Sequence, residues 1–262
     1  MTGKNRWLLD WNPPSSARTL IVCLPHAGSG ANQFRPWQEL LGPRVALLAV
    51  QLPGRENRWR EPPATRAAEV IDELVPELLD RLDRPYLVFG HSMGALLGYE
   101  LALALGREHG RWPGHFVASA SRAPHRQTPD ESIAGLDDRQ LVEELIADGA
   151  VPDYVARDER LIRLVTRPLR GDIALCDDYT PTPGPLRCPV DGWRGEADLG
   201  VSDHHIREWS DCSGAGASIR TYPGGHLYHL ADPHPVVDGL RRLAAGLEQR
   251  PQEQPEASPN AP

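Results

Sequence analysis

The feature that most constrains the fold is an apolar run that leads directly into a glycine-flanked serine. Residues 85–89 (PYLVF) have the content of a buried strand, and Gly90-His-Ser-Met-Gly94 follows at once. An apolar helical sequence, 95–106, comes next. Strand, G-x-S-x-G and helix in this order form the pattern of a nucleophile elbow, in which the glycines permit a very tight turn. The pattern predicts that Ser92 stands above a β-sheet at a helix N-terminus.

Strand and helix patterns alternate along most of the chain. Continuous apolar runs at 19–24, 45–50 and 85–89 suit strands buried on both faces. Further strands are expected at 115–120, 190–194 and 217–222, and helices at 31–41, 64–82, 95–106 and 235–247. Pro76 is expected to kink the second helix or restart a turn. Together with the elbow, the alternation predicts an α/β-hydrolase fold with a mostly parallel, doubly wound sheet.

One interval, 121–189, breaks this alternation. It shows helical patterns at 137–147 and 158–169 and no convincing strand. We expect about 122–188 to form a helical lid, since large insertions beside active sites usually cover them; a purely structural elaboration is the alternative.

The domain is expected to span 1–247. A disordered tail is expected at 248–262, where alanine is the only aliphatic residue type.

A serine becomes a strong nucleophile when a base, itself oriented by a carboxylate, takes its proton. After a nucleophile elbow the acid and then the histidine follow along the chain, each on a loop after a strand. Asp198 follows the strand at 190–194, and His226 follows the strand at 217–222 in a Pro-Gly-Gly-His loop. We therefore predict Ser92 as nucleophile, His226 as base and Asp198 as orienting acid. Asp203 and Glu196 are the alternatives for the acid.

The oxyanion of an acyl-transfer intermediate needs two amide donors. The backbone N–H of Met93, directly after Ser92, is the first candidate. The second is Ala27, in the glycine-rich loop after the strand at 19–24. This loop lacks the GxxxxGK[ST] and GxGxxG spacings of nucleotide sites, so no cofactor is expected. No metal is expected either, because His226 and His229 have no carboxylate or cysteine at zinc-ligand spacing.

The remaining late histidines receive no catalytic role: His204 and His205 are expected in a surface helix, and His229 and His234 at the start of the closing helix.

Composition narrows the possible partners. The chain carries 28 Lys and Arg against 36 Asp and Glu, a net charge of −8, which argues against general nucleic-acid binding. The N-terminal sequence lacks the apolar run of a signal peptide, and the longest apolar stretch, 95–105, is too short to span a bilayer. The four cysteines lack metal-ligand spacing and are expected to be free thiols. These features favour a cytoplasmic protein that binds neither nucleic acid nor membrane.

The chain resembles the stand-alone type II thioesterases that accompany polyketide synthases and non-ribosomal peptide synthetases. The likeness runs from Trp7 to about Leu240. It rests on Leu24-Pro-His-Ala-Gly28, Ala49-Val-Gln-Leu-Pro-Gly-Arg-Glu56, Gly90-His-Ser-Met-Gly-Ala95 and Gly224-Gly-His226. The second block is the most specific, because most α/β hydrolases lack it. The insertion also looks like that family's lid, through Pro168-Leu-Arg-Gly-Asp172.

This resemblance implies an editing enzyme that hydrolyses acyl groups from the phosphopantetheine arm of an acyl or peptidyl carrier protein, and we expect it to be a monomer. By position the resemblance assigns the triad to Ser92, Asp198 and His226 and the oxyanion hole to Ala27 and Met93. Three departures bear on the acyl pocket, and one of them is in the insertion, where Asp148-Gly149-Ala150 stands in place of the family's usual Gly-Gly. Leu199 follows the acid where the family often has proline, and Leu-Tyr-His229 follows His226 where two phenylalanines are usual.

Three other interpretations stay open: a carboxylesterase or lipase, a thioesterase domain cut from a synthase, and a non-catalytic carrier-docking protein with a hydrolase fold. The start at Met1 and the Gln-Leu-Pro-Gly-Arg-Glu block weigh against the second. Carrier proteins are usually acidic around their pantetheinylated serine, so arginines near the mouth of the site are docking candidates. These are Arg55, Arg58, Arg60, Arg122 and Arg126.

Overall fold

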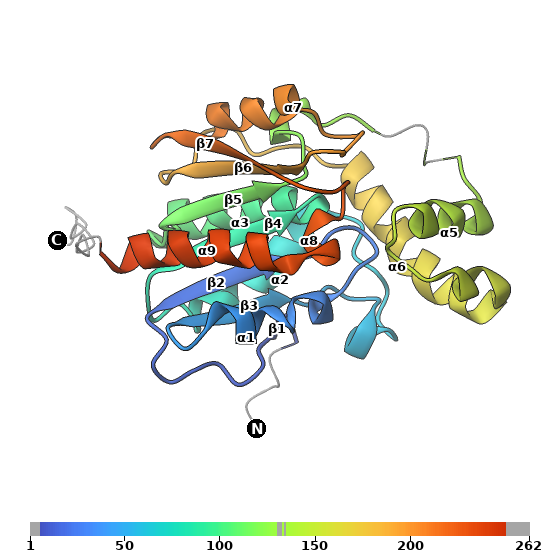
Figure 1. Cartoon of the computed structure of the whole chain (residues 1–262), viewed down its shortest axis with the longest axis horizontal. Coiled ribbons are helices and arrows are strands. Elements are labelled where there is room, and N and C mark those ends of the chain that lie inside the picture. The colour runs from blue at the N-terminus through green and yellow to red at the C-terminus, as the bar shows by residue number, and fades with distance from the viewer. Residues whose placement is uncertain (1–5, 130–132, 134, 250–262) are drawn as a thin grey trace.

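Seven strands form one sheet, in the order β1-β3-β2-β4-β5-β6-β7, in the computed structural model, which describes residues 6–129, 133 and 135–249 (Figure 1). Every neighbouring pair is parallel except β1, which runs antiparallel to β3 at the sheet edge. The strands are β1 (Leu8–Leu9), β2 (Thr19–Leu24), β3 (Val45–Val50), β4 (Tyr86–His91), β5 (His115–Ser119), β6 (Val190–Gly195) and β7 (Ala217–Tyr222).

Helices cover both faces of the sheet. Helices α2 and α3 pack on one face, and α1 and α9 pack on the other (Figure 1). The helices are α1 (Trp37–Leu41), α2 (Ala67–Leu79), α3 (Met93–His109), α5 (Asp138–Ala147), α6 (Glu159–Asp177), α7 (Asp203–Arg207), α8 (Tyr228–Ala231) and α9 (Pro233–Glu248). The predicted doubly wound α/β-hydrolase architecture is confirmed.

The side chains of β2 show why continuous apolar runs occupy the centre of this sheet. Val22 and Leu24 join the apolar cluster that includes α3, whereas Ile21 and Cys23 join the cluster on the opposite face with α1 and α9. Successive side chains of a strand point to opposite faces, so both sets must be apolar when helices cover both. Each such side chain stabilises the fold by about 1.5–3 kcal/mol when fully buried.

Prolines account for the clearest difference from the expected helices. The sequence 31–41 is not one helix but a 3₁₀ turn, Ala31–Phe34, followed by Pro36 and α1. Pro36 is the residue directly before α1, where the N–H that proline lacks has no helical partner to lose. Helix α2 instead continues through Pro76 and ends three residues later, at Leu79. Strand β1 was not expected, because two residues are too few to show a periodicity.

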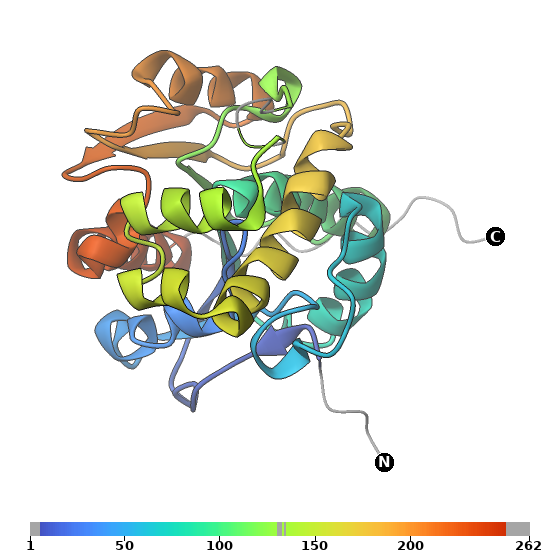
Figure 2. The ribbon, with the colours of Figure 1, turned by 90° about the vertical axis from the view of Figure 1, so that its right-hand side faces the viewer.

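Between β5 and β6 the chain forms α5 and α6, which project beyond the carboxyl edge of the parallel strands (Figures 1 and 2). With the 3₁₀ turn Asp153–Arg157 they share a small apolar cluster, centred on Val142, Val155 and Ile162, that is separate from the two main clusters. Helix α6 continues through Pro168 to Asp177, well beyond its expected end at 169.

The C-terminal boundary differs slightly from the predicted one. Helix α9 includes Glu248, the first residue of the predicted tail, and residues 250–262 of that tail lie outside the described residues. Among the residues that are described, no helix combines the length and apolar character needed to cross a bilayer.

Candidate active site

Ser92 lies between the last residue of β4 and the first residue of α3. Its φ of 53° and ψ of −120° place a non-glycine residue in a backbone region that costs about 1–3 kcal/mol. The surrounding structure imposes this conformation, since the Ser92 N–H donates to the Ser119 carbonyl at 2.8 Å. A Cβ on Gly90 would lie 2.2 Å from the Gly94 oxygen, and one on Gly94 would lie 2.3 Å from the Leu24 oxygen. The structure therefore contains the predicted elbow.

His226 and Asp198 meet at the same carboxyl edge of the sheet. His226 Nδ1 lies 2.9 Å from Asp198 Oδ2, and because an ionised carboxylate only accepts, Nδ1 carries the proton. The other carboxylate oxygen, Oδ1, accepts from the N–H groups of Gly200 and Val201 at 2.9 and 3.0 Å. Burial favours a higher pKa for Asp198, but these hydrogen bonds and the nearby His226 outweigh burial and lower it. Asp198 is thus held as an anion that orients His226.

Asp203 and Glu196, the alternatives for the acid, do not pair with His226. Asp203 Oδ1 pairs with Arg194 Nη1 at 2.7 Å on the exposed side of the loop, and Glu196 is exposed. The acid loop and the histidine loop are joined by backbone hydrogen bonds, including Ala197 N–H to the Gly224 carbonyl at 2.8 Å. A Cβ on Gly195 would lie 2.1 Å from the Gly225 oxygen, so glycine permits this close approach.

Three buried histidines lie around His226, a feature that the sequence did not predict. The ring of His91 lies 5.3 Å from that of His226 and 3.9 Å from that of His229, and His26 lies 5.7 Å from His229. Burial lowers the pKa of His26 to about 3 and holds the pKa values of His91 and His229 well below the usual range. These three neighbours stay neutral and therefore add no positive charge beside His226.

His229 corrects one expectation in particular. It lies in α8, fully buried, rather than at the start of α9. Its Nε2 lies 3.0 Å from Gln33 Oε1, and because that amide oxygen accepts, Nε2 donates. No pattern in the sequence marks His229 as inward-facing, because its position depends on how the chain after β7 folds into α8.

The glycine-rich loop after β2 forms a tight turn. The Ser29 N–H donates to the His26 carbonyl at 3.1 Å, and Gly28 has a φ of +79°, as the third position of a type II turn requires. Ala27 is the second position of this turn. Met93 begins α3, where the amides have no intrahelical acceptor. Both predicted oxyanion donors thus belong to segments that flank Ser92 or pack beside it, since Gly94 abuts the end of β2.

The Gln-Leu-Pro-Gly-Arg-Glu block holds this loop in place. Gln51 Oε1 accepts from the Ala31 N–H at 2.9 Å, and Glu56 accepts from Asn32 Nδ2 at 2.8 Å. Arg55 Nη1 donates to the Ser29 carbonyl at 3.1 Å. The block that is most specific in sequence is therefore a support for the candidate oxyanion loop.

A buried ion pair connects the same loop to α6. Arg55 and Asp172 are 4% and 0% exposed, and their two hydrogen bonds measure 2.5 and 2.8 Å. Asp172 Oδ2 also accepts from the Gly28 N–H at 2.7 Å. Burial raises the pKa of Asp172, and the Arg55 guanidinium opposes that rise. The ion pair thereby fixes α6 against the turn that contains Ala27.

Arg55 and Arg58 are therefore wrong as docking candidates. Arg58 is 5% exposed and pairs with Glu61 at 2.7 Å. Arg126 is exposed but pairs with Glu208 at 2.9 Å. Exposed Arg60 and partly buried Arg122 stay candidates.

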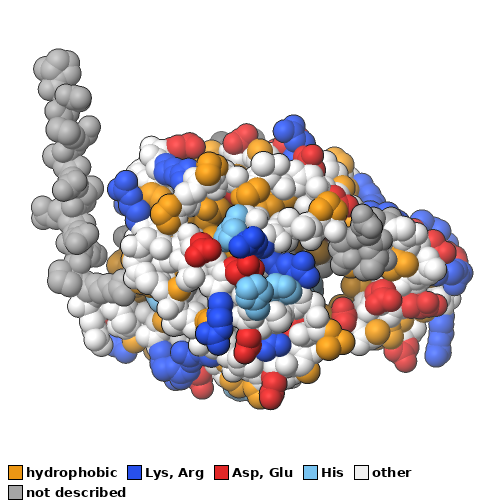
Figure 3. Space-filling view, turned by 90° about the horizontal axis from the view of Figure 1, so that it is seen from above, with side chains coloured by type: hydrophobic (Ala, Val, Ile, Leu, Met, Phe, Trp, Pro, Cys, Tyr) orange, Lys and Arg blue, Asp and Glu red, His pale blue; other side chains and the backbone are white. Residues whose placement is uncertain are grey.

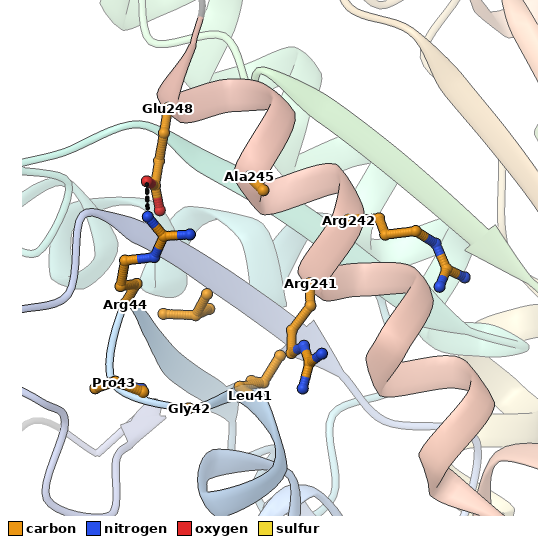
Figure 4. Close-up of a pocket in the computed structure, with 9 residues that line it drawn as sticks. Leu41, Gly42, Pro43, Arg44, Arg241, Arg242, Ala245 and Glu248 are labelled. Atoms are coloured by element: carbon orange, nitrogen blue, oxygen red, sulfur yellow. Dashed lines mark ion pairs between the residues drawn. The ribbon is translucent and has the colours of Figure 1, made fainter.

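A hollow of about 520 Å³ lies at the opposite edge of the sheet (Figure 4). It is lined by residues around the start of β3 and by the last turns of α9, where Arg44 pairs with Glu248 at 3.5 Å. Because β3 and β4 run in the same direction, the start of β3 lies far from Ser92 at the end of β4. This hollow is separate from the candidate active site.

The described residues contain no group of three or more His, Cys, Asp or Glu that could hold a metal ion.

The fold and the elbow define an α/β hydrolase, and comparisons with known proteins give the family. The family model described as "Thioesterase domain" matches residues 19–243, and the chain belongs to this family. It is 33% identical to Thioesterase PikA5 of Streptomyces venezuelae over 89% of this chain and 84% of that protein. It is 28% identical to Gramicidin S biosynthesis protein GrsT of Aneurinibacillus migulanus over 89% of this chain and 92% of that protein.

A solved structure gives the same result. The type II thioesterase BorB from the borrelidin biosynthetic cluster matches with a TM-score of 0.84 and 34% identity, over 93% of this chain and 100% of that one. The resemblance to type II thioesterases and the prediction of a thioester hydrolase are thus confirmed.

The close approach at Gly94 can be tested by adding one methyl group. Gly94→Ala should lower the free energy of unfolding by at least about 2 kcal/mol, because the new Cβ would strike the Leu24 carbonyl. Gly246→Ala is the matched control: nothing lies within 4 Å of its added Cβ, and alanine should stabilise α9 by up to about 1 kcal/mol. Urea unfolding measures both. Equal stability of the two variants would contradict this packing.

The Arg55–Asp172 pair makes a second prediction. Asp172→Asn should cost about 3–5 kcal/mol of unfolding free energy, because it leaves Arg55 buried without a counter-charge. The double variant Arg55→Met/Asp172→Leu should lose less than Asp172→Asn, since it removes both charges. Glu159→Gln, which breaks the exposed Arg139–Glu159 pair of the lid, should cost under about 1 kcal/mol. In urea unfolding of the set, an Asp172→Asn loss no larger than that of Glu159→Gln would refute the role given to the buried pair.

Proposed function

We propose that this protein is a type II thioesterase that hydrolyses acyl thioesters from the phosphopantetheine arm of acyl or peptidyl carrier proteins, in polyketide or non-ribosomal peptide biosynthesis. The observation that carries the proposal is the strained Ser92 at the same sheet edge as the His226–Asp198 pair. The similarity to BorB and PikA5 over most of the chain supports the substrate class.

The contact between His226 and Asp198 supports the roles proposed for the site. Asp198 accepts a hydrogen bond from the Nδ1–H of His226, which leaves Nε2 as the base that takes the proton of Ser92. Ser92 Oγ attacks the thioester carbonyl, and the N–H groups of Ala27 and Met93 stabilise the oxyanion. His226 then returns the proton to the departing pantetheine thiol. Water, activated by the same histidine, releases the acid and restores Ser92.

The chemistry uses only side chains and amides of this chain, and phosphopantetheine enters as part of the substrate. We propose that the protein acts as a cytoplasmic monomer, because one chain supplies every residue of the site. Its role would be editing, the removal of acyl groups that block a carrier.

Ser92→Ala should reduce the hydrolysis of acyl-carrier thioesters by at least about 10³-fold, because the acyl-enzyme can no longer form. Ser210→Ala, a change at an exposed serine far along the chain, is the control and should keep the parental rate. Release of the carrier thiol, followed by a thiol reagent, gives the rates. A Ser92→Ala protein that turns over near the parental rate would exclude this mechanism.

The leaving group separates a thioesterase from a carboxylesterase. With a matched acyl group, kcat/KM should be at least about tenfold higher for a pantetheine thioester than for the oxygen ester, a difference of about 1.4 kcal/mol in transition-state stabilisation. Steady-state assays of the paired substrates measure this ratio. A preference for the oxygen ester would favour the carboxylesterase interpretation instead.

A further inference from the structure

The N-terminal half of α6 presents a basic stripe to solvent. Arg160, Arg163, Leu164 and Arg167 are all exposed, and their spacing of three, four and seven residues places them on one face of the helix. Leu164 is 54% exposed and gives this basic face an apolar side chain. In the space-filling view, basic and acidic side chains both lie on the part of the molecule that projects at the right (Figure 3).

Two of these arginines have no acidic partner among the described residues. Neighbouring arginines of the lid are paired, Arg139 with Glu159 and Arg170 with Asp138. Within the part of the chain that the structure describes, Arg160 and Arg163 form no ion pair. In a chain whose net charge is −8, unpaired arginines on one helix face indicate a surface that meets negative charge elsewhere.

An aromatic side chain extends this surface. Arg167 donates to the carbonyls of Trp59 and Glu61 at 2.8 and 3.2 Å, which brings the loop after β3 beside α6. Trp59 is 49% exposed, and the Arg60 guanidinium lies 5.0 Å from the centre of its ring. Exposed apolar groups surrounded by arginine are typical of protein-binding surfaces. We call the whole set the lid patch: Trp59, Arg60, Arg160, Arg163, Leu164 and Arg167.

The lid patch is continuous with the candidate site. Leu169 of α6 packs against Gly28, its Cβ 3.5 Å from where a Gly28 side chain would begin. At about 1.5 Å of rise per residue, Arg160 lies about 14 Å along the helix from Leu169. A protein seated on the patch is therefore close enough for an extended arm to enter beside the oxyanion loop.

We propose that the lid patch docks the acidic face of the carrier protein whose arm delivers the thioester. The proposal rests on the proposed function and adds the surface and the charge of the partner. Exposed acids at the end of α5 explain why docking should select α6, since Glu143, Glu144 and Asp148 would repel an acidic partner. A polyanion such as RNA fits less well, because the chain as a whole is acidic.

The test compares one acyl group on two thiols: the arm of an acyl carrier protein and free pantetheine. Arg160→Glu/Arg163→Glu should raise KM for the carrier-bound substrate at least about tenfold, leave its kcat unchanged and leave both constants for acyl-pantetheine unchanged. Arg18→Glu, at an exposed arginine near the start of β2, is the matched control and should change none of these values. For the parent, KM for the carrier should rise with salt, and the rise should be smaller in the double variant.

The outcomes separate the two proposals. If the parent hydrolyses neither thioester, the proposed function is wrong. If it hydrolyses both and the double variant matches it on the carrier, the docking surface is wrong. Equal losses on carrier and pantetheine substrates would also overturn docking, since they would mean that the substitutions disturb the lid. Binding of RNA that the double variant loses, together with an unchanged KM for the carrier, would show that the patch binds RNA instead.

Discussion

The Arg55–Asp172 ion pair joins the segments that must meet at the candidate site. Arg55 belongs to the loop after β3, Asp172 to the inserted helix α6, and Gly28, whose N–H donates to the carboxylate, to the loop after β2. A buried carboxylate close to amides that are meant to bind an oxyanion would oppose them, and the Arg55 guanidinium offsets that charge. The second half of the inserted helix thus forms part of the wall beside the candidate oxyanion turn.

The strained Ser92 and the His226–Asp198 pair lie at the same carboxyl edge of the sheet. Strands β2, β4, β6 and β7 are parallel, so the loops after them lie together. The close approaches at glycines allow Ser92 to keep its positive φ, and backbone hydrogen bonds join the acid loop to the histidine loop. Burial lowers the pKa values of His91 and His229, so these neighbours add no positive charge beside His226.

Local motifs and their order along the chain could be predicted from the sequence. The strand before Ser92, the glycines beside it and the order of acid and histidine depend on short motifs, and these located the elbow and the His226–Asp198 pair. The Arg55–Asp172 contact spans 117 residues, and nothing in either segment indicates the other except that both lie in blocks shared with the family. The sequence therefore predicted a surface position for Arg55. His229 was missed for a related reason, because only the folded loop turns it inward beneath His91.

The most direct test of the central claim is active-site titration with a fluorophosphonate, which reacts with serine only when an adjacent base and oxyanion hole activate it. We expect one phosphonate per chain, located on Ser92 by peptide mass spectrometry, with thioesterase activity lost in proportion to labelling. Labelling at another residue, or full activity in protein whose Ser92 is modified, would contradict the assignment of Ser92 as the activated nucleophile.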